Sequence, residues 1–243
     1  MDSERFEQAV AAYTPKDFAG ALRGPKLAVI AEMKQRTPSM GVLSDDYRPA
    51  DLAHAYAEGG AVAISVLTHM AGFGGRVEHL RSVRAATELP ILRKDFVTDP
   101  YEVAEARACG ADAVLLIVAA LQPDQLRDLI ALARSRGIAA LVEVHDEPET
   151  AAALDAGATV IGINHRDLRT FEVDLGLTTR LRKLVAPEVV VVAESGIHSA
   201  EDARRMREAG ADAVLVGEIL MRSADPAAQI RDLTAAGARG AHS

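Results

Sequence analysis

The sequence predicts a single (β/α)₈ barrel, and a repeated pattern of apolar runs is the first reason for it. Four segments share a glycine, a small residue and then an apolar run, and four further apolar runs lie between them. A helix-like segment follows each run, and strict alternation of strands and helices is typical of a parallel sheet. The eight predicted strands lie within residues 27–34, 59–68, 90–96, 109–118, 138–145, 156–165, 189–195 and 209–218.

The character of these runs favours a closed barrel over an open sheet. Each run is continuously apolar, which indicates a strand that is covered on both faces. None of them has the polar pattern of an exposed edge strand, and eight such units match a closed barrel. Capping residues mark several helix starts. These starts are Asp99-Pro100, Gln122-Pro123, Ser199 with Asp202, and Asp225-Pro226.

We expect residues 1–243 to form one domain, because no linker divides the chain. Residues 1–26 precede the first strand and carry apolar residues at helical spacing, so they predict one or two short helices that close one end of the barrel. Residues 236–243 are small and polar and predict a frayed tail.

The composition excludes several classes of partner. The formal net charge is −8, whereas nucleic-acid binding needs a basic face. No apolar run approaches the ~20 residues of a membrane span. The polar start lacks a signal-peptide core, so the cytoplasm is the expected location. The single cysteine, Cys109, allows no internal disulfide and is expected to be a small buried thiol.

Polar residues interrupt the apolar runs at their C-terminal ends, where the active sites of such barrels lie. Converging charges at a barrel mouth cost desolvation, so they indicate function rather than folding. An anionic substrate would need such local positive groups, since the whole chain is acidic. The residues at these ends are Glu32, Lys34, Lys94, Asp95, Glu143, His145, Asn164, His165, Arg166, Glu194, Ser195 and Glu218.

The loops after the last two strands indicate a phosphate site. Gly196 and Gly217 lie where the backbone would approach a ligand closely, and the segment from Gly217 through Glu218 predicts a short helix. Paired loops of this kind with a short extra helix recur as phosphate sites in barrels. Lys34 belongs to the first strand, which neighbours the last one in a closed barrel, and can supply the compensating charge.

Ordered sequence blocks at these strand ends resemble the indole-3-glycerol phosphate synthase family over nearly the whole chain. The blocks are IAEMK followed by PS and G, SVLT with FGG, ILRKDF, ADAVLLI, LVEVH, GINHRDL, VAESGI and LVGE. The resemblance implies ring closure of 1-(2-carboxyphenylamino)-1-deoxyribulose 5-phosphate to indole-3-glycerol phosphate, with loss of CO₂ and water, in tryptophan biosynthesis. No metal or organic cofactor is implied, because rearomatisation drives the decarboxylation.

The resemblance also implies roles for individual residues. Lys94 matches the catalytic lysine, and an ammonium near carboxylates can protonate the ketone oxygen. Glu143 is implied as an acid/base residue, and Lys34 as a phosphate or carboxylate ligand and second acid. Glu32 and Asn164 would orient the anilino nitrogen and the hydroxyls. The remaining implied contacts are Phe73, Phe96, Leu115 and Leu116 with the aryl ring, Arg166, Glu194 and Ser195 in the polar shell, and Gly196, Gly217 and Glu218 with Lys34 at the phosphate.

Four positions depart from the commonest family pattern, namely Thr37, Met40, His69 and Arg76. They lie in the predicted cover of the substrate, so a pathway-specific paralogue remains an alternative. His145 and His165 end neighbouring strands, but their spacing fits no local two-histidine metal signature, and hydrogen-bonded structural roles are expected.

Two further hypotheses stay open. A Schiff-base lyase would use Lys94 as a nucleophile, and a phosphate-binding barrel without catalysis would serve as an interaction subunit. A barrel of the phosphoribosylanthranilate isomerase type is disfavoured by the Glu-x-Lys and Lys-Asp-Phe motifs. A monomer or weak oligomer is expected, open to association with other tryptophan-pathway enzymes.

Overall fold

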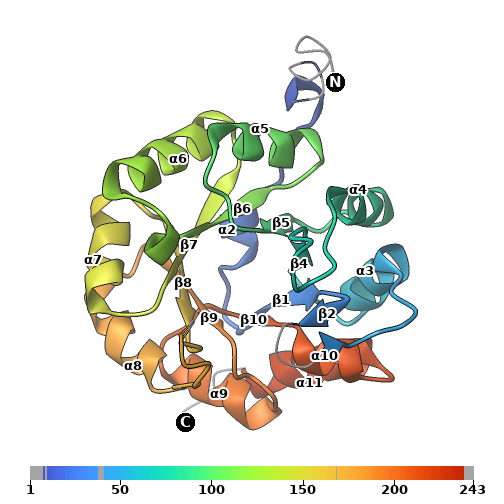
Figure 1. Cartoon of the computed structure of the whole chain (residues 1–243). Coiled ribbons are helices and arrows are strands. Elements are labelled where there is room, and N and C mark those ends of the chain that lie inside the picture. The colour runs from blue at the N-terminus through green and yellow to red at the C-terminus, as the bar shows by residue number, and fades with distance from the viewer. Residues whose placement is uncertain (1–7, 9, 38–40, 168, 238–243) are drawn as a thin grey trace.

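Eight parallel strands close into a barrel in the order β1, β10, β9, β8, β7, β6, β5, β4 (Figure 1). The computed structural model describes residues 8, 10–37, 41–167 and 169–237. Each predicted apolar run contains one barrel strand, so the predicted (β/α)₈ barrel is confirmed. The strands are β1 (Ala28–Met33), β4 (Ala63–Leu67), β5 (Ile91–Lys94), β6 (Ala113–Ile117), β7 (Ala139–Val144), β8 (Val160–Asn164), β9 (Val190–Glu194) and β10 (Ala213–Val216).

Helices form a ring outside the strands (Figure 1). Predicted caps begin three of them, because Asp99, Ser199 and Asp225 each accept a backbone N–H of the first turn. A small hairpin of β2 (Arg36–Thr37) and β3 (Gly41–Val42) follows β1. The outer helices are α3 (Pro49–Glu58), α4 (Val77–Ala86), α5 (Pro100–Ala108), α6 (Pro123–Ser135), α7 (Glu147–Asp155), α8 (Leu177–Leu181), α9 (Ala200–Glu208), α10 (Glu218–Arg222) and α11 (Pro226–Ala236).

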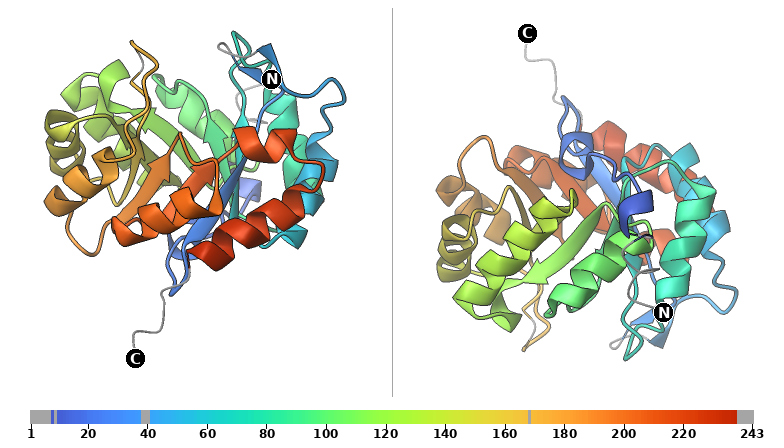
Figure 2. Two further views of the ribbon diagram at one scale, coloured as in Figure 1. Left: turned by 90° about the horizontal axis from the view of Figure 1, so that it is seen from below. Right: turned by 90° about the horizontal axis from the view of Figure 1, so that it is seen from above.

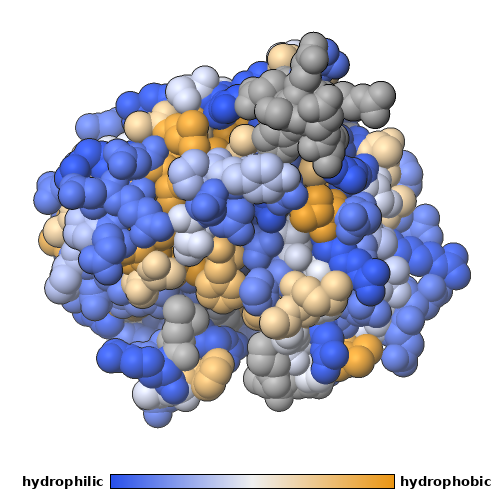
Figure 3. Space-filling model, turned by 45° about the horizontal axis from the view of Figure 1, so that its top comes forward, coloured by the Kyte–Doolittle hydropathy of each residue, from blue (hydrophilic) through white to orange (hydrophobic). Residues whose placement is uncertain are grey.

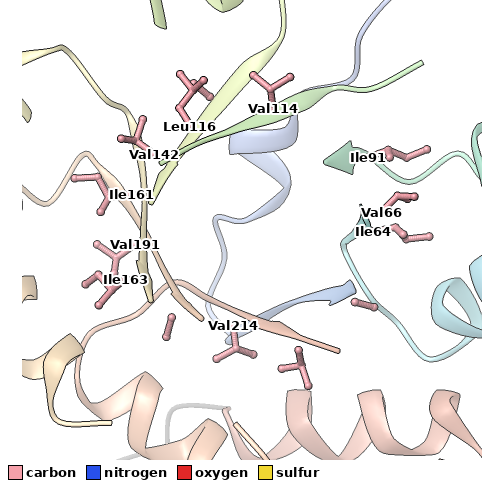
Figure 4. Packing of buried hydrophobic residues seen from close by; sticks show 14 of the residues in the cluster. Ile64, Val66, Ile91, Val114, Leu116, Val142, Ile161, Ile163, Val191 and Val214 are labelled. Atoms are coloured by element: carbon pink, nitrogen blue, oxygen red, sulfur yellow. The ribbon is translucent and has the colours of Figure 1, made fainter. Parts of the chain in front are cut away.

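The strands separate the core into two layers, because successive side chains point to opposite faces of a strand. In β6, Ala113, Leu115 and Ile117 belong to the cluster inside the barrel. Val114 and Leu116 belong to the larger cluster between the strands and the helices. Figure 4 shows this outer layer around the barrel. The same alternation decides which strand-end residues can reach the mouth.

A short helix, α2 (Phe18–Ala21), closes the end of the barrel opposite the β2–β3 hairpin (Figure 2). Phe18 and Leu22 are fully buried and pack into the inner cluster. The hydroxyl of Tyr13 donates to Asp112 Oδ1 at 2.7 Å, which ties the preceding segment to the start of β6. The predicted N-terminal helical closure is therefore present, with Phe6 lying outside the described residues.

In two copies of the glycine-containing repeat, the aspartate before the strand has a structural role. Asp112 precedes β6 and accepts the backbone N–H of Ile91 at 2.7 Å. Asp212 precedes β10 and accepts the backbone N–H of Val191 at 2.9 Å. Each carboxylate thus pins the start of one strand to the neighbouring strand, at the end of the barrel away from the site.

The C-terminal tail is ordered further than the sequence indicated. Ala236 is the last residue of α11, and the carbonyl of Gly237 accepts the backbone N–H of Leu27 at 3.2 Å. A Cβ on Gly237 would lie too close to the side chain of Leu27. The expected fraying from residue 236 is therefore wrong for Ala236 and Gly237, and residues 238–243 lie outside the described residues.

Most of the molecular face in Figure 3 is hydrophilic, and its apolar residues form separate patches. Met70, Phe96 and Phe171 are among the large apolar side chains that are exposed, and each follows the C-terminal end of a barrel strand. Within the described residues, no helix is both long and apolar enough to cross a membrane.

Candidate active site

A cavity of about 240 Å³ opens at the C-terminal ends of the barrel strands. It brings together all the predicted site residues except Leu116. The predicted residues that line it are Glu32, Lys34, Phe73, Lys94, Phe96, Leu115, Glu143, Asn164, Arg166, Glu194, Ser195, Gly196, Gly217 and Glu218. Strand alternation turns Glu32, Leu115 and Glu143 inward, and the loops after the strands supply residues such as Phe73, Arg166 and Ser195.

Lys94, the last residue of β5, lies between two buried carboxylates. Its Nζ is 3.2 Å from Glu143 Oε2 and 3.2 Å from Glu194 Oε2. Burial alone would lower the pKa of Lys94, but the charges of Glu194, Glu143 and Glu32 raise it well above its usual value. Lys94 is therefore an ammonium at neutral pH. This state suits a proton donor, whereas a Schiff-base nucleophile must first become a free amine.

Glu143 is surrounded by donors on both of its oxygens. Besides the contact with Lys94, its Oε1 accepts from Asn164 Nδ2 at 3.1 Å and lies 3.4 Å from His145 Nε2. Burial would raise the pKa of Glu143, but Lys94, His145 and Asn164 together lower it to about 2. Glu143 is therefore ionised and held in a fixed orientation.

Glu194 has the opposite environment, although it faces the same lysine. It is 1% exposed, and its Oε1 has no hydrogen-bond partner among the described residues. Burial raises the pKa of Glu194 to about 7, against the lowering effect of Lys94. The carboxylate fits because Gly162, on the adjacent β8, has no side chain; a Cβ there would overlap with Glu194 Oε1. Two carboxylates on one ammonium thus differ in their protonation near neutral pH.

Glu32 and Lys34 form a second ion pair at the mouth. They are two residues apart at the end of β1 and share one side of the chain. Gly217, which follows β10, permits their approach, since a Cβ on it would lie 2.7 Å from Glu32 Oε1 and 3.1 Å from Lys34 Nζ. Glu218 lines the cavity but its carboxylate lies 3.6 Å from Arg222 Nε, so only its backbone N–H suits an anion.

The loop after β9 has an unusual backbone at the cavity wall. Ser195 has a φ of 66° and Gly196 a φ of 75°. A left-handed serine costs conformational energy, and such residues cluster at functional sites. His165 supports the loop, because its Nδ1 lies 2.9 Å from the Ser195 carbonyl and its Nε2 lies 2.7 Å from Thr178 Oγ1. The two contacts explain a buried histidine without any metal.

An aromatic group borders the opposite wall of the cavity. The His69 ring packs edge-to-face against Phe96 at 5.0 Å and Phe73 at 6.4 Å between ring centroids. Asp95 holds this group in place, since its Oδ1 lies 3.0 Å from His69 Nδ1 and its Oδ2 accepts from Thr68 Oγ1 at 2.6 Å. This wall can hold a flat aromatic ring.

The predicted contact between Leu116 and a substrate is wrong. Leu116 is fully buried in the outer layer of β6, between the strands and the helices (Figure 4). Consecutive strand residues cannot both face inward, and Leu115 with Ile117 takes the cavity side. Among the altered cover positions, Thr37 and His69 line the cavity and Arg76 does not; Met40 lies outside the described residues.

Sequence reasoning missed Phe171 as a lining residue. It lies in the loop after β8, is 56% exposed and has a φ of 61°. An aromatic residue shortly after the polar end of a strand was the available signal. No group of three or more His, Cys, Asp or Glu side chains within the described part of the chain could hold a metal ion.

The fold and the site together define a (β/α)₈-barrel enzyme with a buried lysine between two glutamates at the C-terminal mouth of its strands. The model of the indole-3-glycerol phosphate synthase family matches residues 2–233. The chain belongs to this family.

Relatives of known name agree with this placement. Indole-3-glycerol phosphate synthase 2 of Streptomyces coelicolor is 62% identical over 227 residues, which cover 93% of this chain and 88% of the relative. Indole-3-glycerol phosphate synthase of Roseiflexus sp. is 50% identical over 241 residues, which cover 96% of this chain and 90% of the relative. The structure of thiamine phosphate pyrophosphorylase from Pyrococcus furiosus superposes with a TM-score of 0.66 at 19% identity, covering 90% of this chain and 97% of that one, and this likeness shows the fold alone.

Proposed function

We propose that this protein closes the ring of 1-(2-carboxyphenylamino)-1-deoxyribulose 5-phosphate to give indole-3-glycerol phosphate, CO₂ and water in tryptophan biosynthesis. The observation that carries the proposal is the buried ammonium of Lys94, 3.2 Å from each of two carboxylates at the mouth of the barrel. Membership of the family supports the same reaction.

Lys94 acts in the first step as the acid at the ketone oxygen. The aryl carbon that bears the carboxylate attacks the ketone carbon, and the ketone oxygen takes up the proton of the ammonium as the new C–C bond forms. The alkoxide that would otherwise form is a far stronger base than an amine, so the transfer is favourable even though the pKa of Lys94 is raised. CO₂ then leaves, and the electron pair of its bond restores the aromatic ring.

The second step removes the new hydroxyl as water. Lys34 is the acid for the departing oxygen, and Glu143 accepts the proton that leaves carbon 1 of the former sugar. The lone pair of the anilino nitrogen assists the departure, and Glu32 with Asn164 orients this nitrogen and the hydroxyls. Glu194, whose pKa is raised to about 7 by burial, can return a proton to Lys94 across their 3.2 Å contact.

The substrate lies across the mouth of the barrel in this proposal. The phosphate binds near Lys34 and the backbone of Ser195, Gly196 and Gly217, while the Glu218 carboxylate stays outside this site. The aryl ring packs against the wall of Phe73, Phe96 and Leu115, and Arg166 completes the polar shell. These local cations offset the net charge of −8 for an anionic substrate.

We also keep cytoplasmic location and a monomeric or weakly oligomeric state as part of the proposal. The family supports the location, because a biosynthetic enzyme suits the cytoplasm.

Turnover is tested by following the fluorescence of the indole product with the carboxyphenylamino substrate. The wild-type protein should give a signal, and Lys94→Met should lose at least about two orders of magnitude of kcat, the usual scale for removing a general acid. Wild-type turnover no greater than that of the variant would rule out the synthase. Borohydride trapping tests the lyase alternative, since a stable adduct at Lys94 would contradict the acid role.

A further inference from the structure

His145 and Glu149 lie beside the site but carry none of the roles assigned above. We propose that they form a positioning pair that holds Glu143 as an ionised, oriented carboxylate and so distinguishes it from Glu194. The inference rests on the proposed function, because Glu143 and Glu194 flank the lysine that is assigned as the acid.

The pair is defined by three contacts. His145 follows Glu143 by two residues, so both side chains lie on the same side of the chain. The imidazole Nδ1 lies at hydrogen-bond distance, 3.0 Å, from Glu149 Oε2, and Nε2 lies 3.4 Å from Glu143 Oε1 in an ion-pair contact without hydrogen-bond geometry. Glu149 Oε2 also accepts the backbone N–H of His145 at 2.8 Å. Both ring nitrogens therefore face carboxylates.

The two carboxylates favour a charged imidazole. A neutral histidine has a single N–H, so its other nitrogen would turn a lone pair toward a carboxylate oxygen. Protonation places a donor on both sides. Burial would lower the pKa of His145, but Glu143 and Glu149 together raise it to about 10.

The start of α7 fixes the position of Glu149 beside His145. Asp146 is the N-cap residue, and its side chain accepts the backbone N–H of Glu149 at 2.8 Å. The Glu149 side chain then reaches back to His145 instead of into solvent. One short segment, from Glu143 to Glu149, therefore contains both the carboxylate and the groups that orient it.

The surrounding charges show why the pair distinguishes the two glutamates. Lys94, on β5, contacts Glu143 and Glu194 at equal distance. His145 adds a second cation beside Glu143, while Glu194 Oε1 has no hydrogen-bond partner within the residues that the structure describes. Asn164, on β8, is neutral, and Glu32, on β1, acts on Lys94 and Glu194 as a more distant charge. The asymmetry between the two carboxylates therefore originates in His145 and Asn164, and of these two His145 is the one that adds a charge.

The first test measures protonation without any substrate. Histidine NMR titration of the intact protein, with His145→Gln to assign the signal, should show His145 still doubly protonated at about pH 8, well above the ordinary value of about 6.5. Glu149→Gln should lower the pKa of His145 by about one unit or more. Glu147→Gln, in the same helical turn but exposed, is the matched control and should change nothing. Titration of His145 at or below about 6.5 in the wild type would overturn the proposal.

The second test is the pH profile of kcat/KM, which reports groups of the free enzyme. The acid limb of the profile should report protonation of Glu143. His145→Gln and Glu149→Gln should both move this limb to higher pH by about one unit, which corresponds to a tenfold change in the proton affinity of Glu143. A purely structural role would lower the rate equally at every pH and leave the limb in place, which would also overturn the proposal. Absence of turnover in the wild type would refute the synthase activity itself, and the NMR arm would still decide the charge on His145.

Discussion

Replacement of Glu194 by glutamine should stabilise the protein above neutral pH and lower its activity. Glu194 is 1% exposed, its Oε1 has no hydrogen-bond partner in the described part of the chain, and burial raises its pKa to about 7 from an ordinary value of 4.5. The charged form is thus tolerated in the folded protein rather than favoured by it. Glutamine keeps the shape of the side chain and removes the charge.

The magnitude follows from proton linkage. An acid with a raised pKa binds its proton more tightly in the folded protein, so the wild-type free energy of unfolding falls as the pH rises from 4.5 through about 7. At about 1.36 kcal/mol per pKa unit, this loss is on the order of 3 kcal/mol above pH 7. The glutamine variant does not suffer it. Below pH 4.5 the two proteins should therefore be equally stable.

Urea unfolding followed by circular dichroism at about pH 8 and about pH 5 measures the difference. At the higher pH the stabilisation should also raise the Tm of the variant. The expected rise is about 2–4 °C for each kcal/mol in a chain of this length. Glu58→Gln, at an exposed position of α3, is the control and should change neither value appreciably. A Glu194→Gln protein that is less stable than the wild type at about pH 8, or that shows the same gain at about pH 5, would refute the reasoning.

Three further substitutions test the backbone positions around the site. Gly162→Ala should displace Glu194, whose Oε1 would overlap with the new Cβ, and lower kcat/KM on the order of a hundredfold while the unfolding midpoint changes little. Gly217→Ala should push Lys34 from its place, 3.1 Å from the new Cβ, and raise KM about tenfold; an unchanged KM in steady-state assays would contradict the phosphate assignment. Ser195→Gly should relieve the positive φ of 66° and raise the free energy of unfolding by about 1 kcal/mol; loss of stability on urea unfolding would show that the serine side chain outweighs the strain.

The fold could be predicted from the sequence because its signals are local. A glycine that ends a helix and a cap such as Asp99 or Ser199 act within a few residues, so each element is marked where it begins or ends. The role of Asp112 was not predictable in the same way. Its carboxylate bonds to Ile91 and Tyr13, which are remote in sequence, and the sequence gives no sign of this pairing.

The site could be predicted only as a set of residues. Strand ends and period-two alternation bring Glu32, Lys94 and Glu143 to one mouth, and the same alternation should have excluded Leu116 once Leu115 was chosen. The left-handed backbone of Phe171 depends on the path of its loop, and no local sequence pattern predicts that path.

The three glutamates of the site differ because of the side chains around them, not because of their positions at the strand ends. Glu32, Glu143 and Glu194 all stand at strand ends and face inward, so a sequence reading treats them alike. Glu32 pairs with Lys34 from its own strand. Glu143 and Glu194 share Lys94. They differ because His145 and Asn164 contact Glu143, whereas the absent side chain of Gly162 makes room for Glu194 without giving it a donor. An acid–base reaction requires environments that give two carboxylates different pKa values. Here His145 and Gly162, which were not among the predicted site residues, create that difference together with the predicted Asn164.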